Sequence, residues 1–348
     1  MSFQVLGSDG IDSLRWQSFY DRLPVFFRSI HFSPAYARAY AALPRCAVLE
    51  RKDSFVMQPF WTRPDAGGST MENVYGYGGP ITNTLLGVSD LGIEFEQCMN
   101  AWRAEAGIIC ERMVLHPRLA VQVQTTLLPP AVLPLIRKEV VIVRTEAEAF
   151  RAGVTQKRRS AIEKAVRDGI STKRSTSRAQ PLSRFVALYG QTMRRVNAAP
   201  RWKYSHPFFD KIMAELKGQI CVIEAFKDNV VVSAAIVLIS PPQAYYQYAG
   251  NSGVSGASDL LIVDAVRLAA ECGCDTLDLG GGVTTAADDP VLFYKATFSK
   301  DCRADVYVLE RVYDQHKFDE ASKGFEGIGY FPPWRAGEQV NAATQGVE

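Results

Sequence analysis

The sequence predicts an α+β (α/β) protein made of two lobes. The chain has 348 residues, which is more than one hydrophobic core usually organises. An order of elements in the first half (hairpin, strand, glycine turn, helix, strand) also recurs in the second half roughly 170 residues later. We therefore expect an N-terminal lobe over residues 1–150, a C-terminal lobe over 151–335 and a flexible polar tail over 336–348.

The composition is that of a globular protein with reduced thiols. Hydrophobic residues make up 47% and charged residues 22%, and a net charge of +2 does not by itself indicate nucleic acid or membrane binding. Cys272 and Cys274 have no second pair and no nearby histidine, so no zinc site is expected. The first residues do not resemble a secretion signal, and the uncharged run 229–258 is interrupted by prolines. A cytoplasmic protein without a transmembrane segment is therefore expected.

In the second half, two β-branched runs around 227–229 predict a hairpin, and AYYQYAG predicts a third strand. After the loop GNSGVSGAS, the segment SDLLIVDAVRLAAECG predicts a buried helix with Ser258 as N-cap and Gly273 as C-terminal stop. DTLDL predicts a strand, DDPVLFYKATFSK a short helix with Pro290 in its first turn, and ADVYVLERVYD a last strand.

The first half follows the same order. AVLERKDSFVMQPFW predicts a hairpin, MENVYGYGGPIT a strand that leaves through glycines, and VSDLGIEFEQCMNAWRAEAG a helix. ERMVLHP and KEVVIVRT predict two further strands, the second of which would close the first lobe. Three helices are expected between the halves, in TQKRRSAIEKAVRDG, PLSRFVALYGQTMRRVNA and SHPFFDKIMAELKG.

The strongest candidate for a reaction site is a predicted strand that ends in Gly280, Gly281 and Gly282. Glycines there allow the backbone to approach a ligand without a Cβ in the way. The short helix that follows returns Lys295 towards the same edge of the sheet. Its ammonium would stabilise an oxyanion or hold a phosphate or carboxylate. A solvated lysine on a surface helix is the alternative.

Several phrases of the sequence resemble GNAT acyltransferases, and within them the FemABX-like group and its exopolysaccharide-associated relatives. These phrases are QKRRSAIEKAVRDG, YGQTMRRVNAAPRWKYSHPFF, LDLGGG with DDPVLFYKATFS, GYFPPWR, YGYGGP and LHPRL. They lie between about residues 75 and 335. The resemblance implies two tandem GNAT-like lobes, each a mixed, mostly antiparallel sheet flanked by helices, with the active cleft in the C-terminal lobe.

The resemblance further implies an N-acyltransferase that moves an activated acyl or aminoacyl group to an amine. The acceptor would be a small molecule, or a peptidoglycan, other envelope or polysaccharide precursor. No tightly bound cofactor is implied, and aminoacyl-tRNA or acyl-CoA would be the co-substrate. GNSGVSGAS lacks the leading Gln or Arg of a CoA-binding loop, but no long charged hairpin supplies the tRNA-docking arm of some Fem proteins. A secondary-metabolite acceptor and a non-catalytic scaffold remain alternatives.

By resemblance, the reaction centre falls on Tyr294 and Lys295, where the family has Phe-Lys. Asp289 matches the family's acid six residues before the lysine. It would orient Lys295 or the amine, or deprotonate the amine. Alternatively, it caps the helix that begins at Pro290, and the two roles are compatible. No Ser-His-Asp or Cys-His arrangement is recognisable, so direct attack by the acceptor amine is expected.

Further candidates would bind the acceptor substrate. Arg195 and Tyr204 match positions that line the acceptor cleft of the family, and Arg201 lies between them. Alternation predicts that Tyr246 and Tyr248 share one face of a strand while Tyr245 points away, although core packing also explains such tyrosines.

The last two candidates are a glycine turn and a basic segment. Tyr77, in YGYGGP, would lie near a ligand, and a tight turn is the simpler reading of that motif. The basic segment 157–178, with Arg158, Arg159 and Lys164, would meet tRNA or another polyanion, or would be a solvated helix surface.

Overall fold

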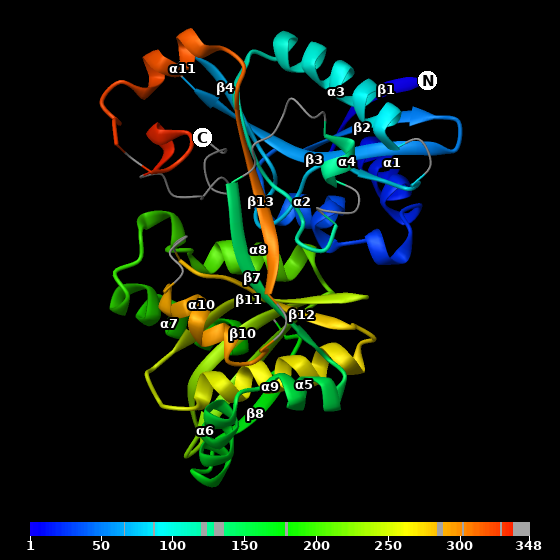
Figure 1. Cartoon of the computed structure of the whole chain (residues 1–348). Helices are drawn as coiled ribbons and strands as arrows, with labels where there is room; N and C mark the ends of the chain where they lie inside the picture. The colour runs from blue at the N-terminus through cyan, green and yellow to red at the C-terminus, as the bar shows by residue number, and fades with distance from the viewer. Residues whose placement is uncertain are drawn as a thin grey trace. The chain divides into compact units, whose positions relative to one another are not determined.

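The computed structural model describes residues 1–65, 67–85, 88–119, 124–128, 136–177, 180–283, 288–300, 303–327 and 329–336 (Figure 1). These residues form two compact units. Unit 1 contains Met1–Lys138 and the described residues from Asp305 onwards, and unit 2 contains Glu139–Ala304. The lobes expected from the sequence, 1–150 and 151–335, differ from these units because the chain returns to unit 1 at its end. Of the expected tail, only Ala336 lies within the described residues.

Unit 1 is built on a mixed sheet in the order β1-β2-β3-β4-β6-β13, with β5 paired to β3. Its parallel pair is β4 and β6, which α3 connects, and its other pairings are antiparallel. The strands are β1 Ser2–Gly7, β2 Arg45–Arg51, β3 Ser54–Asp65, β4 Gly68–Glu72, β5 Ile81–Thr82, β6 Ile108–Val114 and β13 Arg303–Val312. The helices are α1 Gly10–Asp21, α2 Pro34–Tyr40, α3 Val88–Glu105, α4 Thr125–Leu127 and α11 Gln315–Ser322.

Unit 2 is built on a mixed sheet in the order β7-β12-β11-β10-β9-β8. Its parallel pair is β11 and β12, which α9 connects, and its other pairings are antiparallel. The strands are β7 Ile136–Arg144, β8 Ser171–Ser175, β9 Ile220–Lys227, β10 Val230–Ser240, β11 Gln243–Asn251 and β12 Thr276–Gly281. The helices are α5 Ala147–Gly153, α6 Gln156–Arg167, α7 Gln180–Arg195, α8 His206–Glu215, α9 Ala257–Glu271 and α10 Pro290–Ala296.

The closing strands of the two units are exchanged relative to the sequence prediction. The strand KEVVIVR, expected to close the first lobe, is β7 and pairs with β12 of unit 2. The last strand, β13, pairs with β6 of unit 1. Both pairings are antiparallel, so local sequence is compatible with either partner, and only the long-range hydrogen bonds decide between them.

Both faces of the unit 2 sheet are covered, as the continuous apolar runs of β9 and β10 predict. One face packs against α9 in a core that includes Ile223, Val237, Leu261, Ala265 and Leu277. The other face packs against α7. At Gly250 of β11, an added Cβ would lie 2.4 Å from the backbone nitrogen of Tyr189, so only glycine permits this contact.

Local predictions around the hairpin and α9 are mostly confirmed. Asp228 and Asn229 adopt positive φ angles of 51° and 63°, as a two-residue hairpin turn requires, and Gly273, with φ of 76°, follows the end of α9. The expected N-cap, Ser258, is wrong. The N-cap residue is Gly256. A glycine is needed at this position because α6 packs so closely that a Cβ would lie 2.5 Å from the Cβ of Ala165.

Candidate active site

The parallel strands β11 and β12 separate halfway along their length. They pair only from Gln243 and Thr276 to Tyr245 and Asp278, although β11 continues to Asn251. Beyond Asp278, β12 shifts its register against β7. Separation at the carboxyl ends of parallel strands frees backbone polar groups, and ligands of open α/β sheets bind at such points. The geometry therefore directs attention to the end of β12.

Lys295 of α10 lies at this end of β12. Its Nζ donates a hydrogen bond of 2.7 Å to the carbonyl oxygen of Gly281, and the side chain is half-buried. Burial lowers the pKa of Lys295 to about 8, although Asp278 and Asp289 act to raise it. Among the described residues, no acceptor other than Gly281 is found for this ammonium. With a pKa of about 8, the Lys295 ammonium loses its proton just above neutral pH. It lies at the strand end that the sequence predicted.

The three glycines at the end of β12 are explained by the protein's own packing. Gly280 has a φ of 73°, and an added Cβ would lie 3.4 Å from Nζ of Lys295. A Cβ on Gly281 would lie 2.8 Å from the backbone oxygen of Glu139, and one on Gly282 would lie 2.5 Å from the carboxylate of Asp289. The close approach predicted for a ligand is therefore made first by groups of the protein itself.

Asp289 caps α10, as one of its two predicted roles required. It is only 2% exposed, and its Oδ1 accepts hydrogen bonds of 2.9 Å from the backbone nitrogens of Val291 and Leu292. Its Oδ2 accepts a third bond, also 2.9 Å, from the backbone nitrogen of Val283. These backbone hydrogen bonds use both carboxylate oxygens of Asp289. Asp289 thus fixes the turn from β12 into α10.

Tyr294 points away from Lys295 into a polar network. Its hydroxyl donates a 2.7 Å hydrogen bond to Oδ1 of Asp259, and Nη1 of Arg158 lies 2.7 Å from Oδ2 of the same carboxylate. The Arg158 guanidinium also lies 4.6 Å from the centre of the Tyr294 ring, and its Nε donates to Thr297 at 2.9 Å. Arg158 thus joins α6, α9 and α10, and its expected contact with a polyanion stays a prediction.

The prediction that Tyr246 and Tyr248 share one face of β11 is wrong. Ile236 and Val237 of β10 pair with Tyr248 and Tyr246 respectively, so Gln247 is an extra residue in β11. Such a β-bulge reverses the alternation of the side chains that follow it. Tyr246 consequently packs against the core beneath α9, whereas Tyr248 faces the rings of α7 and α8.

Tyr204 belongs to the same aromatic cluster as Tyr248. Their ring centres are 5.6 Å apart, Tyr204 stacks on Phe208 at 4.1 Å, and Tyr204 is 6% exposed. Such burial identifies a packing role for the ring of Tyr204 in unit 2. Its position as a substrate-binding residue therefore stays a prediction.

Arg195 lies at the carboxyl end of β11. Its Nη1 donates to the backbone oxygen of Asn251 at 3.0 Å and its Nη2 to the side-chain oxygen of the same residue at 2.7 Å. Because β11 and β12 are parallel, their carboxyl ends face the same edge of the sheet, so Arg195 and Lys295 belong to the same edge of unit 2. Arg201 is held over the ring of Trp202, 5.8 Å from its centre.

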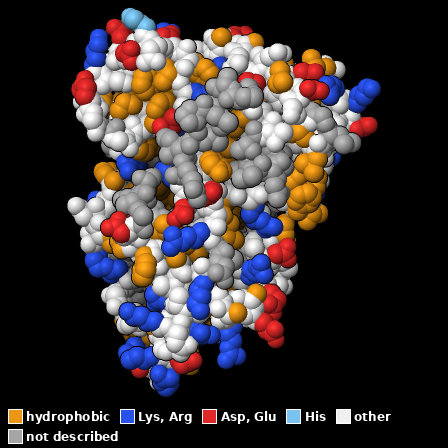
Figure 2. Space-filling model, in the orientation of Figure 1, with side chains coloured by type: hydrophobic (Ala, Val, Ile, Leu, Met, Phe, Trp, Pro, Cys, Tyr) orange, Lys and Arg blue, Asp and Glu red, His pale blue; other side chains and the backbone are white. Residues whose placement is uncertain are grey.

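The remaining predicted residues have separate surroundings. Arg159 is half-buried on α6, and Lys164 is exposed and paired with Asp168. Figure 2 shows Lys and Arg side chains gathered over the part of unit 2 that contains α6 and β8. Tyr77 lies in unit 1, where its ring centre is 5.1 Å from that of His31 and 5.3 Å from that of His116.

Two functional candidates, Asp278 and Asp259, were not predicted from the sequence. Each is buried and lies beside a predicted residue, Asp278 beside Lys295 and Asp259 beside Tyr294. The signal that could have found them is a carboxylate within an otherwise apolar strand or helix, because a buried charge needs a partner.

The described residues contain no group of His, Cys, Asp and Glu placed to hold a metal, and their cysteines are free thiols. None of the described helices is long and apolar enough to cross a membrane.

Comparison with known proteins places these observations in context. Residues 149–295 match the family model described as an acetyltransferase (GNAT) domain. The fold is similar to that of the FemX crystal structure, with a TM-score of 0.68, 12% identity, and coverage of 93% of this chain and 100% of that chain. No curated protein sequence matches the chain.

Two further solved structures share the fold. One is the C-terminal domain of a lysylphosphatidylglycerol synthetase homologue from Agrobacterium fabrum, with a TM-score of 0.55, 16% identity, and coverage of 86% of this chain and 92% of that chain. The other is a tandem GNAT protein from the clavulanic acid biosynthesis pathway, with a TM-score of 0.51, 10% identity, and coverage of 89% and 98%. At identities this low, the structural similarity shows that the fold is shared.

Proposed function

We propose that the protein is an acyltransferase and that Lys295 is the centre of its reaction. Residues 149–295 match the family model of a GNAT acetyltransferase domain, and the chain shares its fold with FemX and with a tandem GNAT protein. The observation that carries this proposal is the position of the Lys295 ammonium, 2.7 Å from the carbonyl oxygen of Gly281, where β11 and β12 have separated. In this reaction an acceptor amine attacks the carbonyl carbon of an activated acyl group, and negative charge develops on the carbonyl oxygen. The intermediate then collapses to the amide as the bond to the tRNA oxygen or CoA sulfur breaks, and the leaving group departs with the proton that the amine loses.

The ammonium of Lys295 stabilises that developing charge. Only one acceptor for its N–H groups is found among the described residues, so further donors are left for a substrate oxygen. Asp289 acts as a positioning residue, since its hydrogen bonds to Val283, Val291 and Leu292 fix the helix that carries Lys295. The Arg158–Asp259–Tyr294 network supports the same helix from its other side.

For the acyl donor, we propose aminoacyl-tRNA in preference to acyl-CoA. The start of α9, where GNAT proteins hold the CoA pyrophosphate, is in contact with α6 through Gly256 and Ala165. The first turn of α9 also already holds a carboxylate of the protein, that of Asp259, which is paired with Arg158. Exposed cations remain on α6 and β8, among them Lys157, Lys164, Arg167 and Lys173.

The acceptor is proposed to be an amine on a small envelope or polysaccharide precursor. Arg195 supports this proposal, because a guanidinium at the same sheet edge as Lys295 suits a phosphate or carboxylate on the acceptor.

A donor experiment tests the proposal. Purified protein is incubated with an amine acceptor and with either radiolabelled aminoacyl-tRNA or radiolabelled acetyl-CoA, and labelled amide product is measured. Product from aminoacyl-tRNA alone supports the proposed donor, and product from acetyl-CoA alone overturns that choice while retaining acyl transfer. Thermal stabilisation by free CoA would independently contradict the tRNA proposal.

A further inference from the structure

Asp278 is a buried carboxylate in the middle of the unit 2 sheet. The residue is 6% exposed, and β12 pairs there with Tyr245 of β11 on one side and with Ile142 of β7 on the other. It is also the last residue of β12 that pairs with β11. Burying a charged group is costly unless hydrogen bonds and an opposite charge compensate for it. The surroundings of the Asp278 carboxylate therefore indicate its role.

A hydrogen bond from this carboxylate fixes the backbone at the end of β12. Its Oδ1 accepts a bond of 2.6 Å from the backbone nitrogen of Gly280, which has a φ of 73°. Leu279, between these two residues, is an extra residue of β12 in its pairing with β7. Such a β-bulge bends the strand and changes the direction of the groups that follow. The group that follows is the carbonyl of Gly281, which accepts from Nζ of Lys295 at 2.7 Å.

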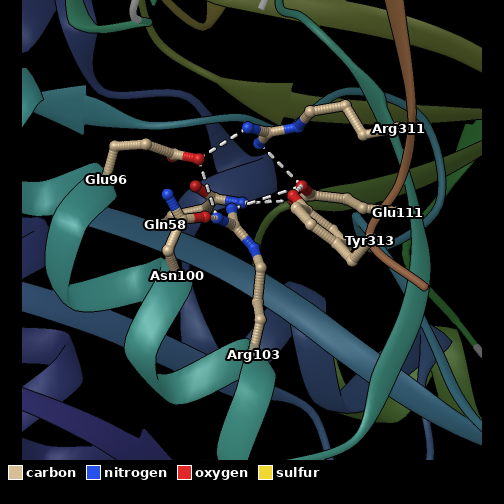
Figure 3. A network of polar contacts seen from close by, with 7 residues as sticks. All are labelled: Gln58, Glu96, Asn100, Arg103, Glu111, Arg311 and Tyr313. Atoms are coloured by element: carbon tan, nitrogen blue, oxygen red, sulfur yellow. Dashed lines mark hydrogen bonds and ion pairs between the residues drawn. The ribbon is translucent and has the colours of Figure 1, made fainter.

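Other buried carboxylates of the protein are paired with guanidinium groups. In unit 1, Glu111 is 1% exposed, and its Oε2 lies 3.2 Å from Arg103 and 2.7 Å from Arg311 (Figure 3). An arginine stays protonated, so the charge of such a partner does not change near neutral pH. For Asp278 the neighbouring cation is the ammonium of Lys295, whose charge does change in this range.

The charged groups around Lys295 are held in different ways. Burial lowers the pKa of Lys295, and Asp278, followed by Asp289, acts to raise it. Asp289 uses both of its oxygens for the backbone hydrogen bonds that begin α10. On the neighbouring strand β7, the carboxylate of Glu139 lies 3.1 Å from Nη1 of Arg303. Asp278 is thus the carboxylate with the strongest effect on the charge of Lys295.

From the hydrogen bond and the position of the charge we propose that Asp278 is a positioning residue that acts on the reaction through Lys295. Its carboxylate holds the bulge that orients the Gly281 carbonyl, and its negative charge keeps the ammonium at the end of β12 protonated. This inference rests on the proposed role of Lys295 in acyl transfer. It predicts that the hydrogen bond and the charge of Asp278 contribute separately.

Two substitutions separate these contributions. Asp278→Asn removes the charge but retains an oxygen that can accept from Gly280, whereas Asp278→Ala removes both. Asp275→Asn is the matched control, because Asp275 lies directly before β12 and is exposed.

Two measurements are made on the full-length proteins. Lysines labelled with carbon-13 at Cε are titrated with pH by NMR, and the signal of Lys295 is identified by its loss in Lys295→Arg. This titration needs no substrate. The kcat/KM for amide formation is then measured against pH with whichever donor, aminoacyl-tRNA or acetyl-CoA, gives product.

The midpoint of the Lys295 titration should move to lower pH by about one pH unit or more in Asp278→Asn, since a nearby opposite charge changes a pKa by about 1–3. The alkaline decline of kcat/KM should move in the same direction. Asp278→Ala should be slower than Asp278→Asn by about tenfold or more at pH 6, because loss of the turn also misplaces the ammonium. Asp275→Asn should match the wild type in both measurements.

An unchanged Lys295 midpoint in Asp278→Asn overturns the inference, and it does so even where an inactive Lys295→Ala retains the proposed function. Because this comparison uses only the asparagine variant, it remains decisive if Asp278→Ala does not fold. Equal rates for folded Asp278→Asn and Asp278→Ala overturn the role of the hydrogen bond. A midpoint that moves as expected, together with wild-type turnover in Lys295→Ala, contradicts the proposed function and the positioning role with it.

Discussion

The ammonium of Lys295 and the carbonyl oxygen of Gly281 are 2.7 Å apart, and this contact joins α10 to the end of β12. Gly280 and Gly281 form the turn that presents this carbonyl: Gly280 has a φ of 73°, and a Cβ on Gly281 would lie only 2.8 Å from the backbone oxygen of Glu139. The contact therefore depends on both the cation and the glycine turn, and it positions the cation where the strands separate.

Replacing Lys295 by Ala should reduce kcat by at least about a hundredfold, because loss of one donor to an oxyanion usually costs 10²–10³ in rate. Thermal unfolding should change little, since the half-buried ammonium is stabilised by only one hydrogen bond found among the described residues. Lys300→Ala, at an exposed lysine, is the control. Wild-type turnover in Lys295→Ala would disprove the assigned role.

The activity should decline above a pH of about 8. The pKa of Lys295 is lowered to about 8 by burial, so the ammonium loses its proton as the pH rises through that value. A pH profile of kcat/KM measures this, and Lys295→Arg should move the decline to higher pH because an arginine stays protonated. Activity that rises through pH 8 would instead indicate that the neutral amine is the active form.

The same lowered pKa predicts a change in stability with pH. The folded protein releases the Lys295 proton near pH 8 and the unfolded chain near 10.5, so the unfolded state binds more protons between these values. The free energy of unfolding of the wild type should therefore rise with pH in this window relative to Lys295→Met. Urea denaturation of both proteins at pH 7.5 and 10 measures the difference, and parallel curves would contradict it.

Breaking the ion pair between Arg158 and Asp259 should destabilise unit 2 by about 3 kcal/mol, because it leaves a buried charge without its partner. The side chain of Asp259 is 5% exposed and that of Arg158 is 19% exposed. Chemical denaturation of Arg158→Met should show this loss, and kcat should fall with it while the alkaline limb of the pH profile stays near 8. Glu163→Ala, at an exposed residue of the same helix, should leave both unchanged.

Two buried histidines should make unit 1 sensitive to acid. Burial lowers the pKa of His31 well below its ordinary value and that of His116 to about 3. Between about 3 and 6.5 the unfolded chain binds more protons, so the free energy of unfolding should fall as the pH decreases through this range. Denaturation of His116→Asn between pH 4 and 7 should show a weaker pH dependence, while His316→Asn, at an exposed site, should match the wild type.

The sequence by itself determined the local structure and its key residues. Asp228 and Asn229 specified the hairpin turn, Asp289 before Pro290 specified the start of α10, and Lys295 was correctly placed after the glycine turn. These features follow from backbone preferences, capping and periodicity, which act over a few residues and are therefore readable from the chain alone.

Only the tertiary structure decided which distant segments meet. It exchanged the closing strands β7 and β13, reversed Tyr248 through the extra residue Gln247, and placed Arg158 against Asp259. Strand partners, register and buried charge pairs are set by hydrogen bonds and packing between segments that lie far apart in the chain, and no local preference records them.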